Sequence, residues 1–248
     1  MNRILLEPDE IDPDGRAVLV GVRAEHVRTV LKGTVGQPLK TGVIDGNIGQ
    51  SVIESISDDS ATIRCMHDQP PLLPWCDLVL APPRPRVLKR LLPQLATLGT
   101  RRIFLVGAEK VEKAFWGAQL LKPEIHRPLL VEGLMQGAVS TILPTIHQVR
   151  NMRRWFESGD FERDFQSQAN RIVAHPYNPG TVPIASGSVP TQSGAVSGTV
   201  PVFAIGPEGG WTDAEVAMLE EHGFRRYGLG ARILKTETAT IALLSRFL

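Results

Sequence analysis

A run of prolines divides the chain into two parts with different hydrophobic patterns. In Pro70-Pro71-Leu72-Leu73-Pro74, each proline fixes its own φ and pushes the preceding residue toward an extended conformation. Short apolar runs separated by turn residues come before this boundary, and strand-like runs alternating with helical periodicity follow it. The 248 residues are about 1.7 times a usual domain of ~150 residues. We therefore expect two domains, residues 1–70 and 75–248.

The first part has the pattern of a small all-β domain. Asp45-Gly46-Asn47 is a strong hairpin signal between two of the expected strands. One short helix is expected from about Ala24 to Leu31. Strands are expected over residues 17–20, 38–44, 51–56 and 60–65. The pattern predicts a small β-barrel with a helical lid.

The second part alternates strands with helices. Leucines recur at helical spacing between residues 85 and 98, and Gly99 is well suited to end that helix. Further helices are expected at 124–136 and 151–156, and strands at 77–81, 102–106, 171–174 and 202–205. This order predicts an α/β domain with a mainly parallel sheet. The uncharged, Gly/Ser/Pro-rich residues from about 180 to 200 predict a flexible insertion.

Composition excludes several classes of protein. The 42% hydrophobic and 21% charged residues are ordinary globular usage. The two cysteines, Cys65 and Cys76, form no CxxC pair, and with His67 they lack a fourth zinc ligand. No apolar run reaches the ~20 residues that span a bilayer, and the N-terminus turns acidic too early for a signal peptide. We expect a cytoplasmic protein with no metal and no membrane segment.

Charge is unevenly distributed along the chain. The net charge of +1 is low for a general nucleic-acid binder. Residues 1–70 hold seven Lys or Arg against eleven Asp or Glu, whereas residues 78–108 hold six basic residues and no acidic one before Glu109. The six are Arg84, Arg86, Lys89, Arg90, Arg101 and Arg102. They form either a solvated helix face or a phosphate-binding surface.

A glycine-rich loop follows the expected strand at residues 202–205. Gly206-Pro207-Glu208-Gly209-Gly210 ends the strand, and Thr212 with Glu215 then has the spacing of a capping box that starts a helix. Glycine at the carboxyl end of a strand lets the backbone approach a ligand in the crevice of an open α/β sheet. The alternatives are a ligand-binding loop and a plain tight turn. The loop is neither G-x-G-x-x-G nor a Walker loop.

A second stretch, residues 227–240, runs from a strand through glycine into a C-terminal helix. Thr236 is the expected N-cap, and Ile241, Leu244 and Leu248 are the expected apolar stripe. Arg232 and Glu237 lie between the strand and the helix, where side chains can face a ligand. The cluster is either functional or a helix cap with one surface ion pair.

Together the two stretches resemble a known family. Residues 205–210 followed by 229–239 closely resemble the two C-terminal motifs of the RsmE-type 16S ribosomal RNA uracil-N3 methyltransferases of the SPOUT superfamily. Residues 3–6, 26–32 and 45–47 resemble that family's PUA-like, RNA-binding N-terminal domain, and 78–107, 132–144 and 174–176 its middle segments. The resemblance implies a SPOUT-type α/β domain with a C-terminal trefoil knot and a homodimer. It also implies S-adenosylmethionine as cofactor and ribosomal RNA or the small ribosomal subunit as substrate.

The resemblance also assigns residues. Arg232 is the candidate for a uracil oxygen or a phosphate, and Glu237 and Glu208 are the candidate carboxylates, which the sequence does not rank. The cofactor would be bound by Ile205, Gly206, Pro207, Glu208, Gly209, Gly210, Leu229, Gly230, Ile233, Leu234, Thr236 and Thr238. The residues expected to bind RNA are Arg3, Arg28, Lys32, Arg84, Arg86 and Lys89.

Two departures from the family pattern leave an alternative open. Many relatives have Glu-Leu-Gly where this chain has Thr97-Leu98-Gly99, and the Arg that usually follows Gln136 is replaced here within Gly137-Ala138-Val139-Ser140. A substrate contact of the middle segment is therefore expected to be absent. The alternative function is a noncatalytic or retargeted RNA-binding protein that retains the fold.

Overall fold

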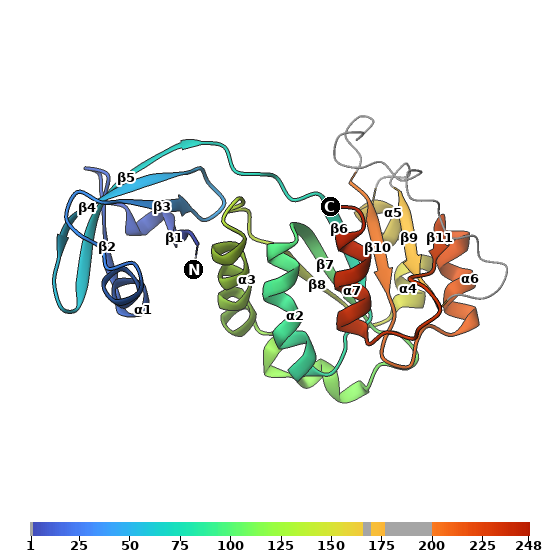
Figure 1. The fold of residues 1–248 in the computed structure, drawn as a ribbon. Coiled ribbons are helices and arrows are strands. Elements are labelled where there is room, and N and C mark those ends of the chain that lie inside the picture. Colours follow the sequence, from blue (N-terminus) through green and yellow to red (C-terminus); the bar gives the residue numbers. More distant parts are fainter. Residues whose placement is uncertain (1, 166–169, 177–199) are drawn as a thin grey trace. The chain divides into compact units, whose positions relative to one another are not determined.

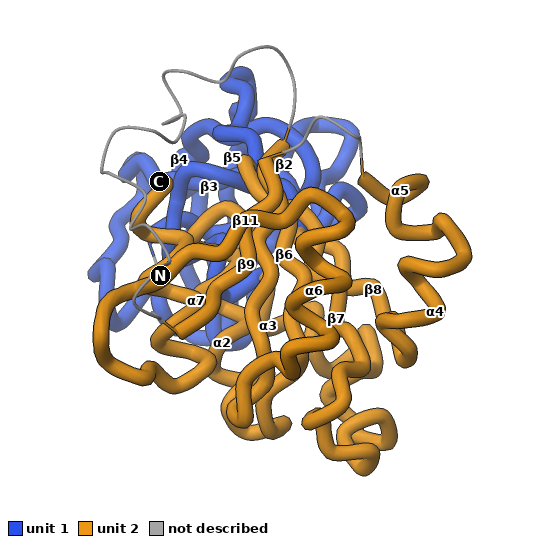
Figure 2. Tube along the Cα trace, turned by 90° about the vertical axis from the view of Figure 1, so that its right-hand side faces the viewer, with its two compact units in different colours: residues 1–74, 131–143 blue, residues 75–130, 144–248 orange. Residues whose placement is uncertain are grey.

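The computed structural model describes residues 2–165, 170–176 and 200–248, so the predicted insertion at about 180–200 lies almost wholly outside the described residues. The chain forms two compact units (Figure 2). The first comprises Met1–Pro74 and Val131–Leu143, and the second comprises Trp75–Leu130 and Pro144–Leu248. The first unit therefore includes a segment that the sequence pattern placed in the second domain.

A mixed five-stranded sheet, curled into a half-barrel, forms the first unit. Its strands are β1 (Ile4–Leu6), β2 (Arg16–Val20), β3 (Pro38–Val43), β4 (Ile48–Ile56) and β5 (Ser60–Gln69), in the order β1-β3-β4-β5-β2. β1 is parallel to β3, and the other pairs are antiparallel. The predicted helix is a short α1 (Gly21–Glu25) that continues as a π-helical turn, η2 (His26–Val30). A 3-10 turn, η1, covers Pro8–Glu10.

The predicted hairpin at Asp45-Gly46-Asn47 is confirmed. Asp45 has φ of 57°, and the backbone N–H of Val43 donates to the carbonyl of Asn47 at 2.9 Å. The segment Val131–Leu143 docks on this turn, because the Thr141 hydroxyl donates to the Gly46 carbonyl and the Leu143 N–H donates to Asp45 Oδ1 at 2.7 Å. These contacts explain why the segment belongs to the first unit.

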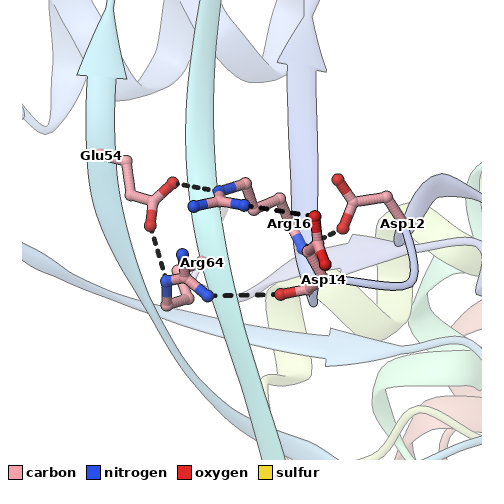
Figure 3. A network of polar contacts seen from close by, with 5 residues as sticks. All are labelled: Asp12, Asp14, Arg16, Glu54 and Arg64. Carbon is pink, nitrogen blue, oxygen red and sulfur yellow. Dashed lines mark hydrogen bonds and ion pairs between the residues drawn. The ribbon is translucent and has the colours of Figure 1, made fainter.

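An ion-pair network lies on the sheet of the half-barrel (Figure 3). Glu54 accepts from Arg16 Nε at 2.8 Å and from Arg64 Nε at 2.6 Å. Asp14 adds a 3.6 Å ion pair to Arg16, and the Asp12 carboxylate accepts from the Arg16 backbone N–H. Hydrogen bonds from the two guanidinium groups lower the pKa of Glu54. The two arginines on this surface are thus engaged by neighbouring carboxylates.

A six-stranded sheet, parallel throughout, forms the second unit and confirms the predicted parallel α/β fold. The strands are β6 (Cys76–Leu80), β7 (Thr100–Val106), β8 (Thr145–Val149), β9 (Arg171–Ala174), β10 (Val202–Ile205) and β11 (Phe224–Tyr227). Their order is β11-β9-β10-β6-β7-β8, and every pair is parallel. The helices are α2 (Pro85–Thr97), α3 (Pro123–Gly137), α4 (Met152–Glu157), α5 (Asp160–Asp164), α6 (Asp213–Glu221) and α7 (Thr236–Ser245), with 3-10 turns η3 (Lys113–Gly117) and η4 (Gln119–Leu121). α3 crosses from the second unit into the first.

Helices cover both faces of this sheet, so its central strands are buried on both sides. Val202 and Ala204 of β10 pack into one core cluster with residues of α4, α5 and α6. Phe203, which alternates with them, contacts Phe247, just after α7, at 5.1 Å between ring centroids. α2 and α7 lie side by side on that second face (Figure 1). No helix among the described residues is long and apolar enough to cross a membrane.

Two details of α7 differ from expectation. The N-cap is Lys235, and Thr236 is the first helical residue. Leu243, Leu244 and Phe247 are buried, whereas Leu248 is 56% exposed. The predicted stripe was therefore wrong at Leu248. Leu243 of α7 is buried, and Phe247, two residues beyond the end of α7, meets Phe203 and Tyr227 of the sheet.

Candidate active site

The loops that follow three neighbouring strands enclose one pocket. β9, β10 and β11 are adjacent and parallel, so their carboxyl ends meet at one edge of the sheet. The cavity there has a volume of about 300 Å³. It is lined by Ala174, His175 and Pro176 after β9, by residues 205–211 around the end of β10, and by Leu229, Gly230, Arg232, Ile233, Leu234, Thr236 and Ala239 after β11.

The structure brings together most of the residues predicted from the two motifs. Every residue predicted to bind the cofactor lines the pocket except Thr238, which is exposed. Of the candidate catalytic residues, Arg232 and Glu208 line it, and Glu237 does not. Sequence reasoning missed the loop Ala174–Pro176 and Trp211 as lining. Only the order β11-β9-β10, which periodicity does not encode, places the loop after β9 here.

The first glycine loop is shaped by contacts that exclude side chains. A Cβ on Gly206 would lie 3.1 Å from Trp211 Cδ1 and from the Trp211 backbone N. Gly210 has φ of +69°, and its N–H donates to the Pro207 carbonyl at 2.8 Å to close a turn. This left-handed conformation favours glycine. The glycines of this loop therefore present bare backbone to the pocket, between the side chains of Pro207 and Glu208.

Lys110, from the loop after β7, lies across Gly209. A Cβ on Gly209 would lie 2.9 Å from Lys110 Cδ, and Lys110 Nζ donates to the Gly209 carbonyl at 2.8 Å. The absence of a side chain at position 209 thus makes room for the lysine stem as well as for the pocket.

The Glu215 carboxylate stabilises the same loop through hydrogen bonds to backbone N–H groups. The predicted capping box is confirmed: Thr212 Oγ1 accepts from the Glu215 N–H at 3.3 Å, and Glu215 Oε2 accepts from the Thr212 N–H at 2.8 Å. The other oxygen of Glu215 accepts from the Glu109 backbone N–H at 2.7 Å. Glu215 is only 7% exposed. One buried carboxylate therefore joins the start of α6 to the loop after β7.

A hydrogen bond joins the second motif loop to the first. Thr236 Oγ1 donates to the Gly206 carbonyl at 3.4 Å, and Thr236 itself is buried. Gly230 has φ of +111°. Arg232 is exposed at the pocket and makes no ion pair with any described residue, and Ile233 beside it is 88% exposed.

Glu208 is an exposed carboxylate with a cationic neighbour. Its Oε2 lies 3.7 Å from Nε of Arg84, and the same nitrogen lies 3.4 Å from Glu112 Oε1. Arg84, Glu112 and Glu208 follow β6, β7 and β10, which are neighbours in the sheet. The Glu208 side chain is 44% exposed, so it is not a desolvated acid.

The fold separates the six basic residues between positions 84 and 102 into two groups with different surroundings. Arg101 donates to both carboxylate oxygens of Asp77, at 2.9 and 2.6 Å, and Arg102 donates to Asp77 Oδ2 at 2.6 Å. Asp77 is 1% exposed, so these arginines neutralise a buried charge. They are not part of a basic surface patch, and that part of the interpretation was wrong. Arg84, Arg86, Lys89 and Arg90 remain exposed around the start of α2.

The RNA-binding candidates of the first unit have mixed surroundings. Arg3 is half-buried, and it donates to the backbone carbonyls of Ala138, Thr41 and Gly49 at 2.6–3.0 Å. Burial lowers the pKa of Arg3. Arg28 donates to the Asp58 carbonyl, and Lys32 is exposed. Arg3 thus has a structural position, whereas Arg28 and Lys32 face solvent.

Polar groups around the pocket do not form a metal centre. Among the described residues, no group of three or more His, Cys, Asp and Glu is gathered closely enough to hold a metal ion. The indole Nε1 of Trp211 is buried and has no hydrogen-bond partner in the described part of the chain. A buried donor without a partner is costly.

Comparison with known proteins assigns the family. A family model described as an RNA methyltransferase domain matches residues 71–248. A ribosomal RNA small subunit methyltransferase E from Treponema pallidum is 32% identical over 248 residues, which cover 98% of this chain and 88% of the relative. This chain belongs to the ribosomal RNA small subunit methyltransferase E family. The predicted resemblance and the prediction of an RNA methyltransferase are confirmed at this level.

Solved structures agree with the fold. A ribosomal RNA small subunit methyltransferase E from Neisseria gonorrhoeae, bound to S-adenosyl methionine, has a TM-score of 0.71 and 20% identity, and the match covers 99% of this chain and 95% of that one. A methyltransferase structure from Legionella pneumophila, in complex with the same cofactor, has a TM-score of 0.71 and 22% identity, with coverage of 98% and 95%. The half-barrel and the parallel α/β sheet are thus shared with these proteins.

Proposed function

We propose that this protein transfers a methyl group from S-adenosylmethionine to small-subunit ribosomal RNA, at N3 of a uridine. The observation that carries the proposal is that both C-terminal motif loops line one pocket of about 300 Å³ and are tied together by the hydrogen bond from Thr236 to Gly206. The family to which the chain belongs supports the reaction class. The curated relative is named for ribosomal RNA of the small subunit, which supports the substrate.

The residues of the pocket fit this cofactor. The cavity volume is at the lower end of the roughly 300–1,000 Å³ found for small-molecule pockets. Apolar side chains of Ile205, Leu234 and Ala239 suit an adenine ring, and the backbone at Gly206 and Gly230 can offer N–H and C=O groups to polar ends of a ligand. When bound, the cofactor supplies an electrophilic methyl group. Ile205, Gly206, Pro207, Glu208, Gly209, Gly210, Leu229, Gly230, Ile233, Leu234 and Thr236 would hold it.

The protein must also make the uracil nitrogen nucleophilic. The N3 imide is largely protonated at neutral pH, so a group in the site must remove this proton or stabilise the anion that forms. Arg232 is exposed at the pocket, and its planar guanidinium can donate to a uracil oxygen as negative charge develops there. Between the two carboxylates, Glu208 is better placed to accept the proton, because it lines the pocket and Glu237 does not. The target base must leave its stack, which looped RNA allows at least cost.

Further features of the family belong to the same proposal. The first unit serves as a PUA-like RNA-binding domain, the second contains a C-terminal trefoil knot, and two copies form a homodimer that completes the site. Apolar Ile233 and Leu248 are 88% and 56% exposed, which supports an interface in their vicinity. The exposed residues Arg84, Arg86 and Lys89 contribute to RNA binding.

A methylation assay on small ribosomal subunits and on free 16S ribosomal RNA, with radiolabelled S-adenosylmethionine, tests the proposal. Nucleoside analysis of the product should identify N3-methyluridine. Arg232→Ala should lower single-turnover methylation by roughly 100-fold or more, the usual scale for losing such electrostatic stabilisation. Arg232→Lys should restore little, because an ammonium lacks the planar two-pronged geometry.

Arg153, an exposed arginine on α4 that is outside the pocket lining, provides the matched control. Arg153→Ala should leave methylation unchanged. A different methylated position would overturn the uridine N3 assignment. RNA binding without methyl transfer would support the alternative of a noncatalytic RNA-binding protein.

A further inference from the structure

The two units differ in the groups that bind RNA. The first unit holds 7 Lys or Arg against 12 Asp or Glu, a net charge of −5, whereas the second holds 20 against 14, a net charge of +6. All eight Phe, four Trp and two Tyr of the chain lie in the sequence of the second unit. Phosphate contacts need cations, and unstacked bases are bound on aromatic rings. The first unit has a net negative charge and no aromatic Phe, Trp or Tyr side chain.

Most cations of the first unit are also engaged by the unit itself. Arg16 and Arg64 share Glu54, Arg23 pairs with Glu10, and Arg3 donates to backbone carbonyls (Figure 3 shows the pairs around Glu54). The main phosphate contacts are therefore to be sought in the second unit, close to the pocket, and the first unit would contribute fewer of them.

Arg84 is a cation held at the glycine loop by the strand order. The Ala81 N–H, at the end of β6, donates to the Ile205 carbonyl at the end of β10 at 2.9 Å. Two prolines then lead to Arg84, which precedes α2. Its side chain is 70% exposed and lies 3.7 Å from Glu208 and 3.4 Å from Glu112. Ion pairs this exposed are weak and readily exchanged.

Lys110 is a second cation at the same loop. It comes from the turn after β7, is exposed, and donates to the Gly209 carbonyl. A neutral carbonyl is a poorer partner for an ammonium than a charged phosphate. Arg84 and Lys110 thus each interact with an acceptor in the glycine loop, the Glu208 carboxylate and the Gly209 carbonyl respectively. An RNA phosphate can replace either acceptor.

We propose that Arg84 and Lys110 bind the RNA backbone beside the target nucleotide, and that an RNA phosphate displaces the Glu208 carboxylate as the partner of Arg84. The inference rests on the proposed function, since it locates the RNA next to the methyl-transfer pocket. The exchange leaves the Glu208 carboxylate at the pocket without its cationic partner. Glu208 can then act as the proton acceptor when RNA is bound, whereas it is paired weakly with Arg84 when RNA is absent.

Salt dependence of RNA binding tests the contacts directly. The affinity of the full-length protein for in vitro transcribed 16S ribosomal RNA is measured at several KCl concentrations, with S-adenosylhomocysteine present. Each phosphate contact contributes roughly 0.7–0.9 to the slope of log affinity against log salt. Arg84→Ala and Lys110→Met should each reduce the slope by about that amount. Methionine keeps most of the stem that lies on Gly209 and removes only the charge, so affinity for S-adenosylhomocysteine should change less than about twofold.

Lys40→Ala in the first unit and Arg153→Ala on α4 each remove one exposed positive charge and are the matched controls. Both should leave the slope unchanged. An unchanged slope in Arg84→Ala or Lys110→Met, or an equal reduction in Lys40→Ala, would overturn the proposal. If the unaltered protein failed to methylate RNA, the proposed function would fall, and the slopes would still show where RNA binds.

The exchange at Glu208 has its own test in a double-mutant cycle. If Glu208 competes with RNA for Arg84, Glu208→Gln should tighten RNA binding severalfold in the otherwise unaltered protein. In the Arg84→Ala background the same substitution should have no effect on RNA affinity, because the cation for which Glu208 and RNA compete is absent. Equal tightening in both backgrounds would show general charge repulsion and would overturn the exchange.

Discussion

Glu215 is expected to be the main structural support of the glycine loop. Its two carboxylate oxygens accept from the backbone N–H groups of Thr212 and Glu109, at 2.8 and 2.7 Å, and the residue is 7% exposed. Glu215→Ala leaves both N–H groups without this partner. It also removes a link between the loop after β7, which carries Lys110, and the loop after β10. We expect the substitution to destabilise the second unit and to weaken cofactor binding together.

The size of the effect follows from the two bonds. A hydrogen bond to a charged group contributes about 1.5–3 kcal/mol. Because Glu109 is exposed, water can replace part of one bond, and we expect a loss of about 2–4 kcal/mol in the free energy of unfolding. Thr212→Ala removes only the cap and should cost about 1 kcal/mol. The exposed Glu221, on the same helix, is the control, and Glu221→Ala should cost under about 0.5 kcal/mol.

Tryptophan fluorescence during urea unfolding is a suitable assay, because all four tryptophans lie in the second unit. Hydrogen exchange at the Thr212 and Glu109 amides should accelerate in Glu215→Ala. Calorimetry with S-adenosylhomocysteine reports the effect on the pocket. If Glu215→Ala unfolded at the same urea concentration as Glu221→Ala, the carboxylate would not be a structural support and the reasoning would be refuted.

Three further outcomes are expected. Gly230 has φ of +111°, and a Cβ added there would meet no atom within 4 Å. Gly230→Ala should therefore act through backbone strain of about 1–3 kcal/mol and weaken S-adenosylhomocysteine binding roughly 5- to 150-fold. Calorimetry measures this affinity, and an unchanged value would contradict the prediction. Asp77→Asn should lower the free energy of unfolding, measured by fluorescence, by about 2–4 kcal/mol, because two arginines lose a buried charged partner. A loss under about 0.5 kcal/mol would show that water replaces the carboxylate. Hydrogen bonding to Arg23 lowers the pKa of Glu10, so its stabilising contribution is complete above the unfolded-state pKa and is lost as pH falls toward the lower folded-state pKa. Glu10→Gln should therefore flatten the acid side of the stability profile of the first unit, measured by circular dichroism, and a profile identical to that of the unaltered protein would exclude this pair as a cause.

Local sequence signals determined the elements and the motif loops. The alternation of strands and helices after Pro74 predicted the parallel sheet, Gly99 ends α2 with φ of +80°, and Asp45 forms the predicted hairpin. Thr212 and Glu215 form the predicted capping box. Each of these features depends on residues only a few positions apart, so backbone propensity and side-chain spacing suffice to specify it.

Contacts between distant segments required the tertiary structure. The order β11-β9-β10 placed His175 at the pocket, and the packing of β6 beside β7 directed Arg101 and Arg102 onto Asp77 instead of into a basic patch. The sequence likewise did not indicate that Lys110 lies on Gly209, 99 positions away. Hydrophobic periodicity records which face of an element is buried, and it carries no information about which neighbour buries it. The strand order therefore decided which of the chain's charged residues surround the glycine loop.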